Sequence, residues 1–314
     1  MDIIKWDGQP ITSSGVYSGV PIDRYHNDPE LFSCPAVSKS QLKTLFFLTG
    51  GSPWHFWQFW NQNPERKIRK PTKETDFGKA AHALVLGEEV FGEGYELRPA
   101  QWDDYTKVES RVWRDRVYAE GRTPVTVQDL KTIRKMARAL EANRYVRGGI
   151  LKGDMELTMV LKDPETGLML KVRPDVLSTL KIFSDFKTAA SLKEVFIRAQ
   201  LLSGGYYLQG GAIKLVCEGL DIPFKGFVLV YCTKDEPFQT MAAPLDPVAL
   251  ELGQRMVGQG LKIIARCLET GVWPEPPNFN DGRQPIELLE RDQKRIEEYL
   301  GTLSIDELKA IQAG

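Results

Sequence analysis

The sequence of 314 residues is 42% hydrophobic and 26% charged, as in soluble globular proteins with a large core. Its 41 basic and 42 acidic residues leave a net charge of −1, which excludes a strongly cationic coat but allows a local basic channel for nucleic acid. Four scattered cysteines without a C-x-x-C pair, and the absence of a signal peptide or long apolar run, argue against a zinc or iron–sulfur site and against a membrane span, so we expect a reduced, cytoplasmic protein.

Residues 1–74 are predicted to form an irregular arm followed by two short helices. Gly, Pro and Asp are frequent in residues 1–36. Ser38 is a suitable N-cap for a helix to about residue 47, and Ser52 with Pro53 begins a second helix that is rich in Trp and Phe. The aromatic side chains of residues 54–60 indicate packing on the core, and a stacking platform for a frayed DNA end is the alternative.

The most basic stretch of the chain, residues 62–74, follows the aromatic helix and contains Arg66 and Lys67. A charged loop of this kind is usually solvated. If the protein binds DNA, this stretch is the best candidate for contact with the phosphate backbone.

The next predicted helix begins at Thr75 or Asp76 and carries His82 among apolar residues. A lone histidine in such a helix is more often a hydrogen-bonded core residue than a metal ligand, although neutral imidazole is an acceptable ligand beside carboxylates. Two charged amphipathic helices are predicted to follow, over residues 103–120 and 126–147.

Three strands are predicted in the middle of the chain, over residues 153–162, 168–176 and 180–188. The link between the last two is short enough for a hairpin, which brings Asp175 at the end of one strand close to Asp185 and Lys187 on the next. Residues two apart on a strand face the same side, so Asp185 and Lys187 point the same way.

Two carboxylates and a lysine at one sheet edge are suited to metal-assisted hydrolysis. Like-charged carboxylates repel each other, and Mg²⁺, which prefers carboxylate oxygens, relieves the repulsion. A bound cation activates water and neutralises developing negative charge, and Lys187 can orient the water. The alternative is a hairpin with solvated charges, because the D-x-K tripeptide is common.

The remaining elements are a long helix, two strands, another helix and a tail. Ser191 and Glu194 form a capping box for a helix that contains Tyr206 and Gln209, and its Gly-Gly pairs suggest close packing, a kink or a break. Strands are predicted over residues 224–233 and 238–243, and Asp246 caps a helix to about residue 270. The last 30 or so residues are predicted to form a charged helical tail.

Several of these motifs, taken together and in order, resemble the RecE-type phage exonucleases (exodeoxyribonuclease VIII) of the PD-(D/E)xK nuclease superfamily. Pro174-Asp175 followed by Asp185-x-Lys187 is similar to the superfamily signature. The other similar stretches are Tyr206-x-x-Gln209, the helix with His82, the R-P-D and D-x-K-T-A strings, and the early S-x-S-x-L-K run. The resemblance covers about residues 17 to 245.

The resemblance implies roles for particular residues. Mg²⁺, or Mn²⁺ as a substitute, would be held by His82, Asp175, Asp185 and the carbonyl of Phe186, with Lys187, Gln209 and Tyr206 as further catalytic residues. The family also has an acidic residue near Glu156, which ranks below His82 as a ligand. We expect the DNA-binding residues to be Ser40, Lys43, Arg66, Lys67 and Arg173, with Ser40 and Lys43 near a terminal phosphate.

We therefore predict an α/β protein with a restriction-endonuclease-like core, a central mixed sheet flanked by helices, and helical additions at both ends. The predicted divisions are residues 1–74 near the DNA entrance, the nuclease core at 75–270, and the tail at 271–314.

The resemblance implies a metal-dependent exonuclease that digests linear double-stranded DNA from its ends, 5′ to 3′, and leaves a 3′ strand for a RecT-like annealing protein. It also implies a homo-oligomeric ring and a phage or prophage origin. The alternatives are a structure-specific or CRISPR-adaptation nuclease on the same core, or a non-catalytic DNA-binding recombination partner.

Overall fold

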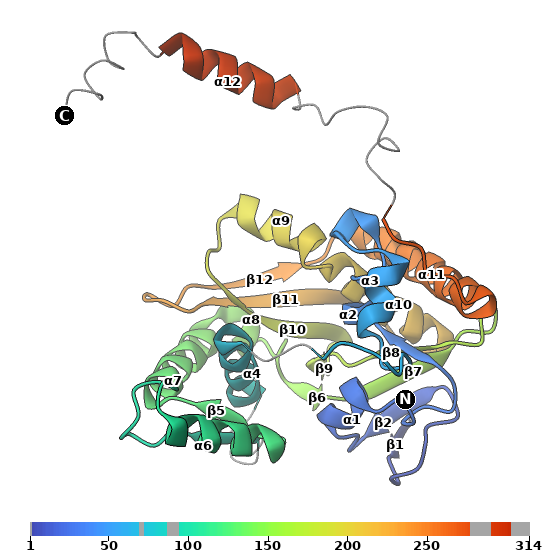
Figure 1. The fold of residues 1–314 in the computed structure, drawn as a ribbon, viewed down its shortest axis with the longest axis horizontal. Helices are drawn as coiled ribbons and strands as arrows, with labels where there is room; N and C mark the ends of the chain where they lie inside the picture. The colour runs from blue at the N-terminus through green and yellow to red at the C-terminus, as the bar shows by residue number, and fades with distance from the viewer. Residues whose placement is uncertain (1, 69–71, 87–93, 277–289, 303–314) are drawn as a thin grey trace. The chain divides into compact units, whose positions relative to one another are not determined.

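The computed structural model describes residues 2–68, 72–86, 94–276 and 290–302. The chain divides into two compact units, Met1–Glu275 and Pro276–Gly314. The first unit contains two five-stranded sheets and a two-stranded sheet among the described residues (Figure 1).

The first sheet joins N-terminal strands to the middle of the chain. Its order is β1-β2-β7-β8-β3, with bounds Ile3–Lys5, Gly15–Ser18, Thr158–Lys162, Met169–Val172 and Ala36–Ser38. Strand β2 is antiparallel to β7, and β3 is parallel to β8. The prediction of an irregular arm over residues 1–36 is therefore wrong. These strands are too short to show periodicity, and pairing with β7 and β8 decides their conformation.

The second sheet carries the predicted hairpin. Its order is β12-β11-β10-β9-β6, with bounds Thr240–Pro244, Gly226–Thr233, Ile182–Ala189, Val176–Ser178 and Gly153–Met155. Strands β10 and β11 are parallel, and the other neighbours are antiparallel. Phe183 of β10 pairs with Leu177 of β9, so the hairpin is confirmed.

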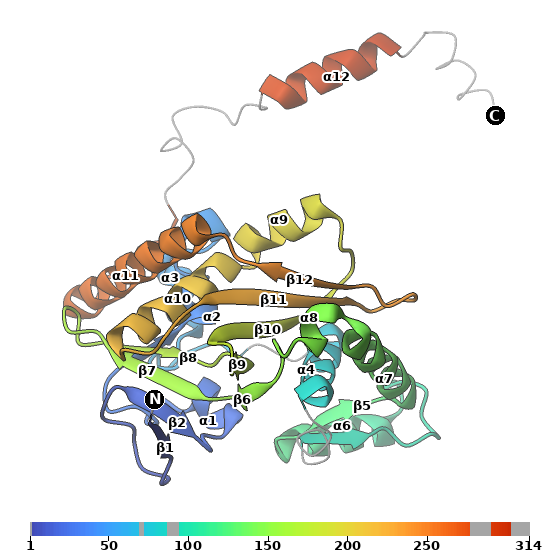
Figure 2. The same cartoon turned by 180° about the vertical axis from the view of Figure 1, so that it is seen from behind.

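Successive side chains of β10 and β11 point to opposite faces of this sheet, and each face is covered by its own hydrophobic core. Phe183 and Leu229 belong to the large core beneath helix α10, whereas Phe186 and Val230 belong to a smaller core beneath helices α4 and α7. These helices span Tyr206–Gly219, Lys73–Leu86 and Val127–Ala142. Figures 1 and 2 show α10 and α11 (Pro247–Thr270) on one side of the sheet and α4 and α7 on the other.

The chain crosses between the two sheets at two adjacent places. Strands β6 and β7 are separated at Glu156, whose backbone lies in the left-handed region with φ of 54°. Strands β8 and β9 are separated at residues 173–175, where Pro174 has no N–H to donate to a neighbouring strand. The Glu156 N–H donates to the Asp175 carbonyl at 3.1 Å. The predicted continuous strands 153–162 and 168–176 are thus each broken, at Glu156 and at residues 173–175.

The long helix predicted after residue 191 is two helices. Helix α9 spans Glu194–Ser203, and α10 begins after Gly205, whose φ of 65° ends the first helix. The predicted capping box at Ser191 is wrong, because the Ser191 hydroxyl accepts instead from the N–H of Lys193 at 3.2 Å.

The aromatic helix α3, Pro53–Phe59, packs on the core as the first interpretation predicted. The Ser52 hydroxyl caps it by accepting from the His55 N–H at 3.0 Å. Phe56 and Trp60 are buried, and Trp57 stacks on Trp273 with ring centroids 4.6 Å apart. Phe56 and Trp60 therefore have no free face for a DNA base, whereas Trp54 of the same helix is 42% exposed.

The remaining elements are mostly short and surround this framework. They are α1 Ile22–Asn27, α2 Lys39–Leu42, the 3₁₀ helix η1 Phe47–Thr49, β4 Tyr95–Leu97, α6 Val108–Ala119, β5 Thr123–Val125 and α8 Arg144–Arg147. The helix predicted to continue from residue 38 to 47 is a single turn, because it ends at Leu42. In the second unit, α12 spans Glu290–Thr302. None of the described helices has the length and apolar character needed to cross a bilayer.

Helices α10 and α11 approach each other through glycines. A Cβ on Gly253 of α11 would lie 2.0 Å from the carbonyl oxygen of Tyr207, and one on Gly211 of α10 would lie 2.2 Å from the backbone nitrogen of Gln254. Neither backbone atom can move without shifting its helix. This close packing fixes α10, the helix that carries Tyr206 and Gln209. As predicted, Asp246 caps α11, accepting from the Val248 N–H at 2.8 Å.

We predict that Gly253→Ala lowers the free energy of unfolding by about 1–3 kcal/mol or more, because the new methyl group overpacks the α10–α11 contact. Gly258→Ala on the same helix is the matched control, since its Cβ meets nothing within 4 Å. It should be neutral or stabilising by up to about 1 kcal/mol. Urea denaturation measures both, and equal effects of the two substitutions would contradict the glycine contact.

Candidate metal centre

His82 and Asp175 meet at the link between β8 and β9. Helix α4 presents His82, whose Nε2 lies 2.6 Å from Oδ2 of Asp175. The same carboxylate oxygen accepts from the N–H of Phe186 at 2.6 Å, and Asp175 is only 6% exposed. The Phe186 N–H therefore anchors Asp175 to β10, the strand that carries Asp185 and Lys187.

Asp185 and Lys187 lie on the same side of β10, as their spacing predicted. Lys187 forms an ion pair with Asp185, and the amide of Gln209 donates to Oδ1 of Asp185 at 2.6 Å. Asp185 is 2% exposed, so its charge depends on these partners. Gln209, for which we predicted a catalytic role, orients this carboxylate.

Glu156 is closer to the centre than its predicted rank implied. Its Oε1 lies 3.6 Å from Nδ1 of His82. One potential ligand atom from each of His82, Glu156 and Asp175 lies within 4.8 Å of the others. The left-handed backbone at Glu156 turns its side chain toward the centre, and the local sequence gives no signal of that conformation.

These charged groups change one another's pKa values. Burial and the charge of Asp185 raise the pKa of Asp175 to about 6. Burial opposes charging of His82, but the carboxylates of Asp175 and Glu156 raise its pKa overall. Burial also opposes the charges of Asp185 and Lys187, yet their mutual attraction lowers the pKa of Asp185 and raises that of Lys187.

The donor set fits a divalent cation. Oε1 of Gln209 is buried without a hydrogen-bond partner, Oδ2 of Asp185 is paired with Lys187, and two carboxylates of like charge lie beside one imidazole. A hard cation with oxygen and imidazole ligands satisfies such a group. Ligand atoms of His82, Asp175 and Glu156 converge closely enough to hold it, and ligation by Asp185 and by the Phe186 carbonyl stays a prediction.

A basic cavity of about 570 Å³ adjoins the centre. Lys187 and Tyr206 line it together with Lys39 and Lys43, and none of the described lining residues is acidic. The Tyr206 ring lies 4.9 Å from Nζ of Lys39 and 5.6 Å from Nζ of Lys187. Burial and the charge of Lys187 lower the pKa of Lys39 to about 7.

Lys39 is a candidate site residue that the sequence analysis missed. The signal available in the sequence is its position directly between Ser38 and Ser40. The tertiary structure was needed to place its ammonium group beside Tyr206, a residue far away in the chain.

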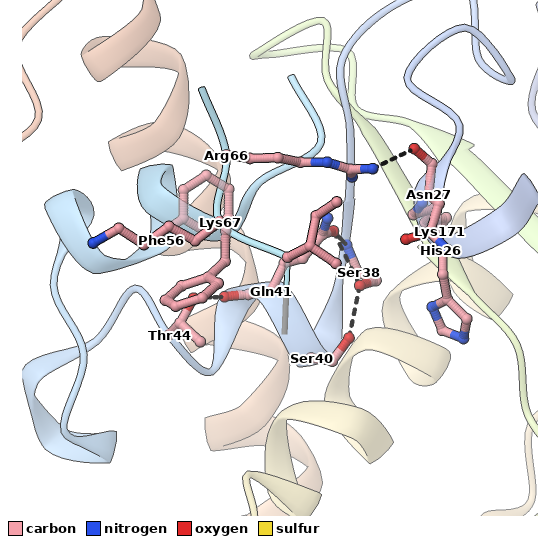
Figure 3. A pocket seen from close by; sticks show the side chains of 12 residues that line it. His26, Asn27, Ser38, Ser40, Gln41, Thr44, Phe56, Arg66, Lys67 and Lys171 are labelled. Atoms are coloured by element: carbon pink, nitrogen blue, oxygen red, sulfur yellow. Dashed lines mark hydrogen bonds between the residues drawn. The ribbon is translucent and has the colours of Figure 1, made fainter. Parts of the chain in front are cut away.

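The predicted DNA-binding residues are placed in two groups. Ser40 and Lys43 line the 570 Å³ cavity, and Ser40 also borders a second cavity of about 230 Å³ that Arg66 and Lys67 line. Figure 3 shows Arg66 reaching to the backbone carbonyl of Asn27, at 3.2 Å. Residues 69–71 of the predicted basic stretch lie outside the described part of the chain.

Arg173 is placed differently from the other predicted DNA contacts. Its side chain is 13% exposed, and Nε donates to Oε2 of Glu156 at 2.6 Å. Its guanidinium therefore has little surface that can face DNA.

Comparison with known proteins agrees with this geometry. The family described as PDDEXK-like domain of unknown function (DUF3799) matches residues 38–278. A crystal structure of a candidate exonuclease from Eubacterium rectale aligns with a TM-score of 0.50 and 15% identity, over 82% of this chain and 91% of that one. The match and the mixed sheet confirm the predicted restriction-endonuclease-like core.

Other comparisons add no further argument. The crystal structure of SSO0001 aligns with a TM-score of 0.22 and 17% identity, over 58% of this chain and 85% of that one, which is too low to support an inference. No curated protein matches the sequence.

We predict that the metal-free protein loses stability as the pH rises from about 5 to about 8. The folded pKa values of Asp175 and His82 are raised, so their stabilising contributions are complete below the unfolded values and are lost as pH rises through the folded ones. Asp175→Asn removes the titration of Asp175 and the largest contribution that raises the pKa of His82, so it should make this part of the profile shallower. Urea denaturation in EDTA at both pH values tests the prediction, and an unchanged slope in the variant would contradict it.

Proposed function

The chain belongs to the family of PDDEXK-like domains of unknown function, and from this premise we propose that it is a metal-dependent nuclease that hydrolyses phosphodiester bonds in DNA. The observation that carries the proposal is the ion pair of Lys187 with Asp185, beside the His82–Asp175 pair and facing a cavity with lysines. A carboxylate pair and an imidazole can hold a divalent cation, and a positioned lysine can orient water, which together support phosphodiester hydrolysis.

Each of these residues has a distinct task in the proposed reaction. His82, Asp175, Asp185 and the Phe186 carbonyl would hold a divalent cation, Mg²⁺ or Mn²⁺, which when bound polarises the phosphate and neutralises its developing charge. Lys187 would donate a hydrogen bond from its ammonium group to the attacking water and so orient it.

Gln209 and Tyr206 support this arrangement from helix α10. Gln209 keeps Asp185 in place through its amide, and Tyr206 presents its ring to the ammonium groups of Lys187 and Lys39. Because α10 is held against α11 by close backbone contacts, both side chains are positioned by a rigid helix.

We assign DNA binding to the two cavities that flank α2. Lys39, Lys43 and Ser40 face the larger cavity, and Arg66 and Lys67 face the smaller one. Neither cavity has an acidic side chain among its described lining residues, so both favour phosphate. A protein of net charge −1 thus confines its attraction for DNA to the site.

The finer proposal is a RecE-type exonuclease that digests linear duplexes 5′ to 3′. It rests on the motif resemblance and on the near-neutral charge, because weak bulk attraction favours enclosure of DNA by a homo-oligomeric ring over a cationic surface. The 3′ strand that remains would pass to an annealing protein of the RecT type.

Linear duplexes labelled at either end, and a covalently closed circle, test the substrate. We expect Mg²⁺-dependent loss of the 5′ label from linear DNA, no reaction in EDTA, and an intact circle. If the 3′ label is released first, the direction of digestion is 3′ to 5′. Linearisation of the circle would favour an endonuclease. If light scattering shows a monomer and this monomer still digests long duplexes processively, the proposed ring is contradicted.

We predict that Lys187→Ala lowers the cleavage rate by about 10²–10³-fold while duplex binding in EDTA survives, because the lysine acts on the water rather than on DNA affinity. Single-turnover cleavage and fluorescence anisotropy measure the two quantities. Lys135→Ala is the matched control, since this lysine also pairs with a carboxylate, Glu236, but is exposed. Near-normal cleavage by folded Lys187→Ala would refute the assignment.

A further inference from the structure

The guanidinium of Arg173 is fixed by hydrogen bonds to three residues. Besides its bond to Glu156, Nη1 donates to the carbonyl of Val20 at 2.8 Å and to the Thr158 hydroxyl at 3.1 Å. The guanidinium also lies 5.8 Å from the centroid of the Tyr25 ring. An arginine that contacts DNA needs free donors, whereas these donors are directed inward.

Glu156 is held through both its backbone and its side chain. Its N–H donates to the carbonyl of Asp175, and its Oε2 accepts from Arg173, while the backbone stays at φ of 54°. A non-glycine residue adopts this conformation at a cost of about 1–3 kcal/mol, so the surrounding bonds must hold it there. The other carboxylate oxygen, Oε1, is left facing Nδ1 of His82 at 3.6 Å.

His82 has two ring nitrogens with different surroundings. Nε2 faces Asp175 at 2.6 Å, and Nδ1 faces Glu156. To ligate a cation through Nε2, the ring must give up any proton there to solvent and keep its proton on Nδ1. A carboxylate that faces Nδ1 at this distance favours that tautomer and ring orientation through its charge.

We propose that Arg173 and Glu156 are positioning residues that hold His82 in the tautomer and orientation required for ligation through Nε2. Arg173 fixes Glu156, and Glu156 fixes His82; we call these three residues the positioning triad. The inference rests on the proposed function, because it takes His82 as a cation ligand. It reassigns Arg173 from contact with DNA to support of the metal centre.

The test measures metal and DNA binding separately, in the full-length protein. Calorimetric titration with Mn²⁺ in the absence of DNA gives the metal affinity, and duplex anisotropy in EDTA gives the DNA affinity. The variants are Glu156→Gln, Arg173→Gln and the double variant, which leaves an uncharged pair if either single variant folds poorly. Arg266→Gln is the matched control, because it removes an exposed arginine paired with Glu269 on α11.

Each single variant should weaken Mn²⁺ binding by about 10–100-fold. The double variant should be no weaker than the worse single variant, because the residues act through one another. Duplex affinity in EDTA should stay within about twofold of wild type, and Arg266→Gln should change neither quantity.

Three results would overturn the proposal in distinguishable ways. Unchanged metal affinity with weaker duplex binding in Arg173→Gln would make Arg173 a DNA contact. Weaker metal binding in Glu156→Gln, but equal or tighter binding in Arg173→Gln, would make Glu156 a direct ligand that Arg173 restrains. If wild-type protein binds neither Mn²⁺ nor Mg²⁺, the proposed metal-dependent function itself fails, and the triad with it.

Discussion

Two buried carboxylates of like charge, Asp175 and Asp185, set the constraint on which the centre depends. Burial makes each charge costly, and their proximity adds repulsion. The protein compensates them differently, since Asp175 is bound by the Phe186 N–H and His82, whereas Asp185 is bound by Lys187 and Gln209. The raised pKa of Asp175 and the lowered pKa of Asp185 follow from these unequal partners. Such a divergence is typical of functional sites.

Asp175 and the residues around it are brought together where the chain passes from one sheet to the other. The chain leaves one sheet and enters the other at Glu156 and again at Asp175, and the two crossings are joined by a backbone hydrogen bond. A continuous strand would alternate its side chains regularly across the two faces of one sheet. The interruption instead lets residues from both crossings converge on His82.

Local charge resolves the apparent conflict between a neutral protein and a polyanionic substrate. The described walls of the two cavities carry lysines and an arginine but no carboxylate. Lys171, which borders the smaller cavity, is 1% exposed and donates to the carbonyl of Tyr25, and burial lowers its pKa to about 7. Attraction for anions therefore falls to the less buried cations of the two walls, Lys43, Arg66 and Lys67, whereas Lys171 is turned into the protein.

The sequence by itself determined the local features of this protein. Alternation and turn residues predicted the β9–β10 hairpin, the shared face of Asp185 and Lys187, and the caps at Ser52 and Asp246, because these depend on residues close together in the chain. Only the tertiary structure decided the rest. The N-terminal strands need partners from β7 and β8, the left-handed backbone at Glu156 is imposed by its surroundings, and the inward position of Arg173 depends on Val20 and Thr158. No local pattern encodes such contacts, because their free energy comes from distant segments that meet only in the folded chain.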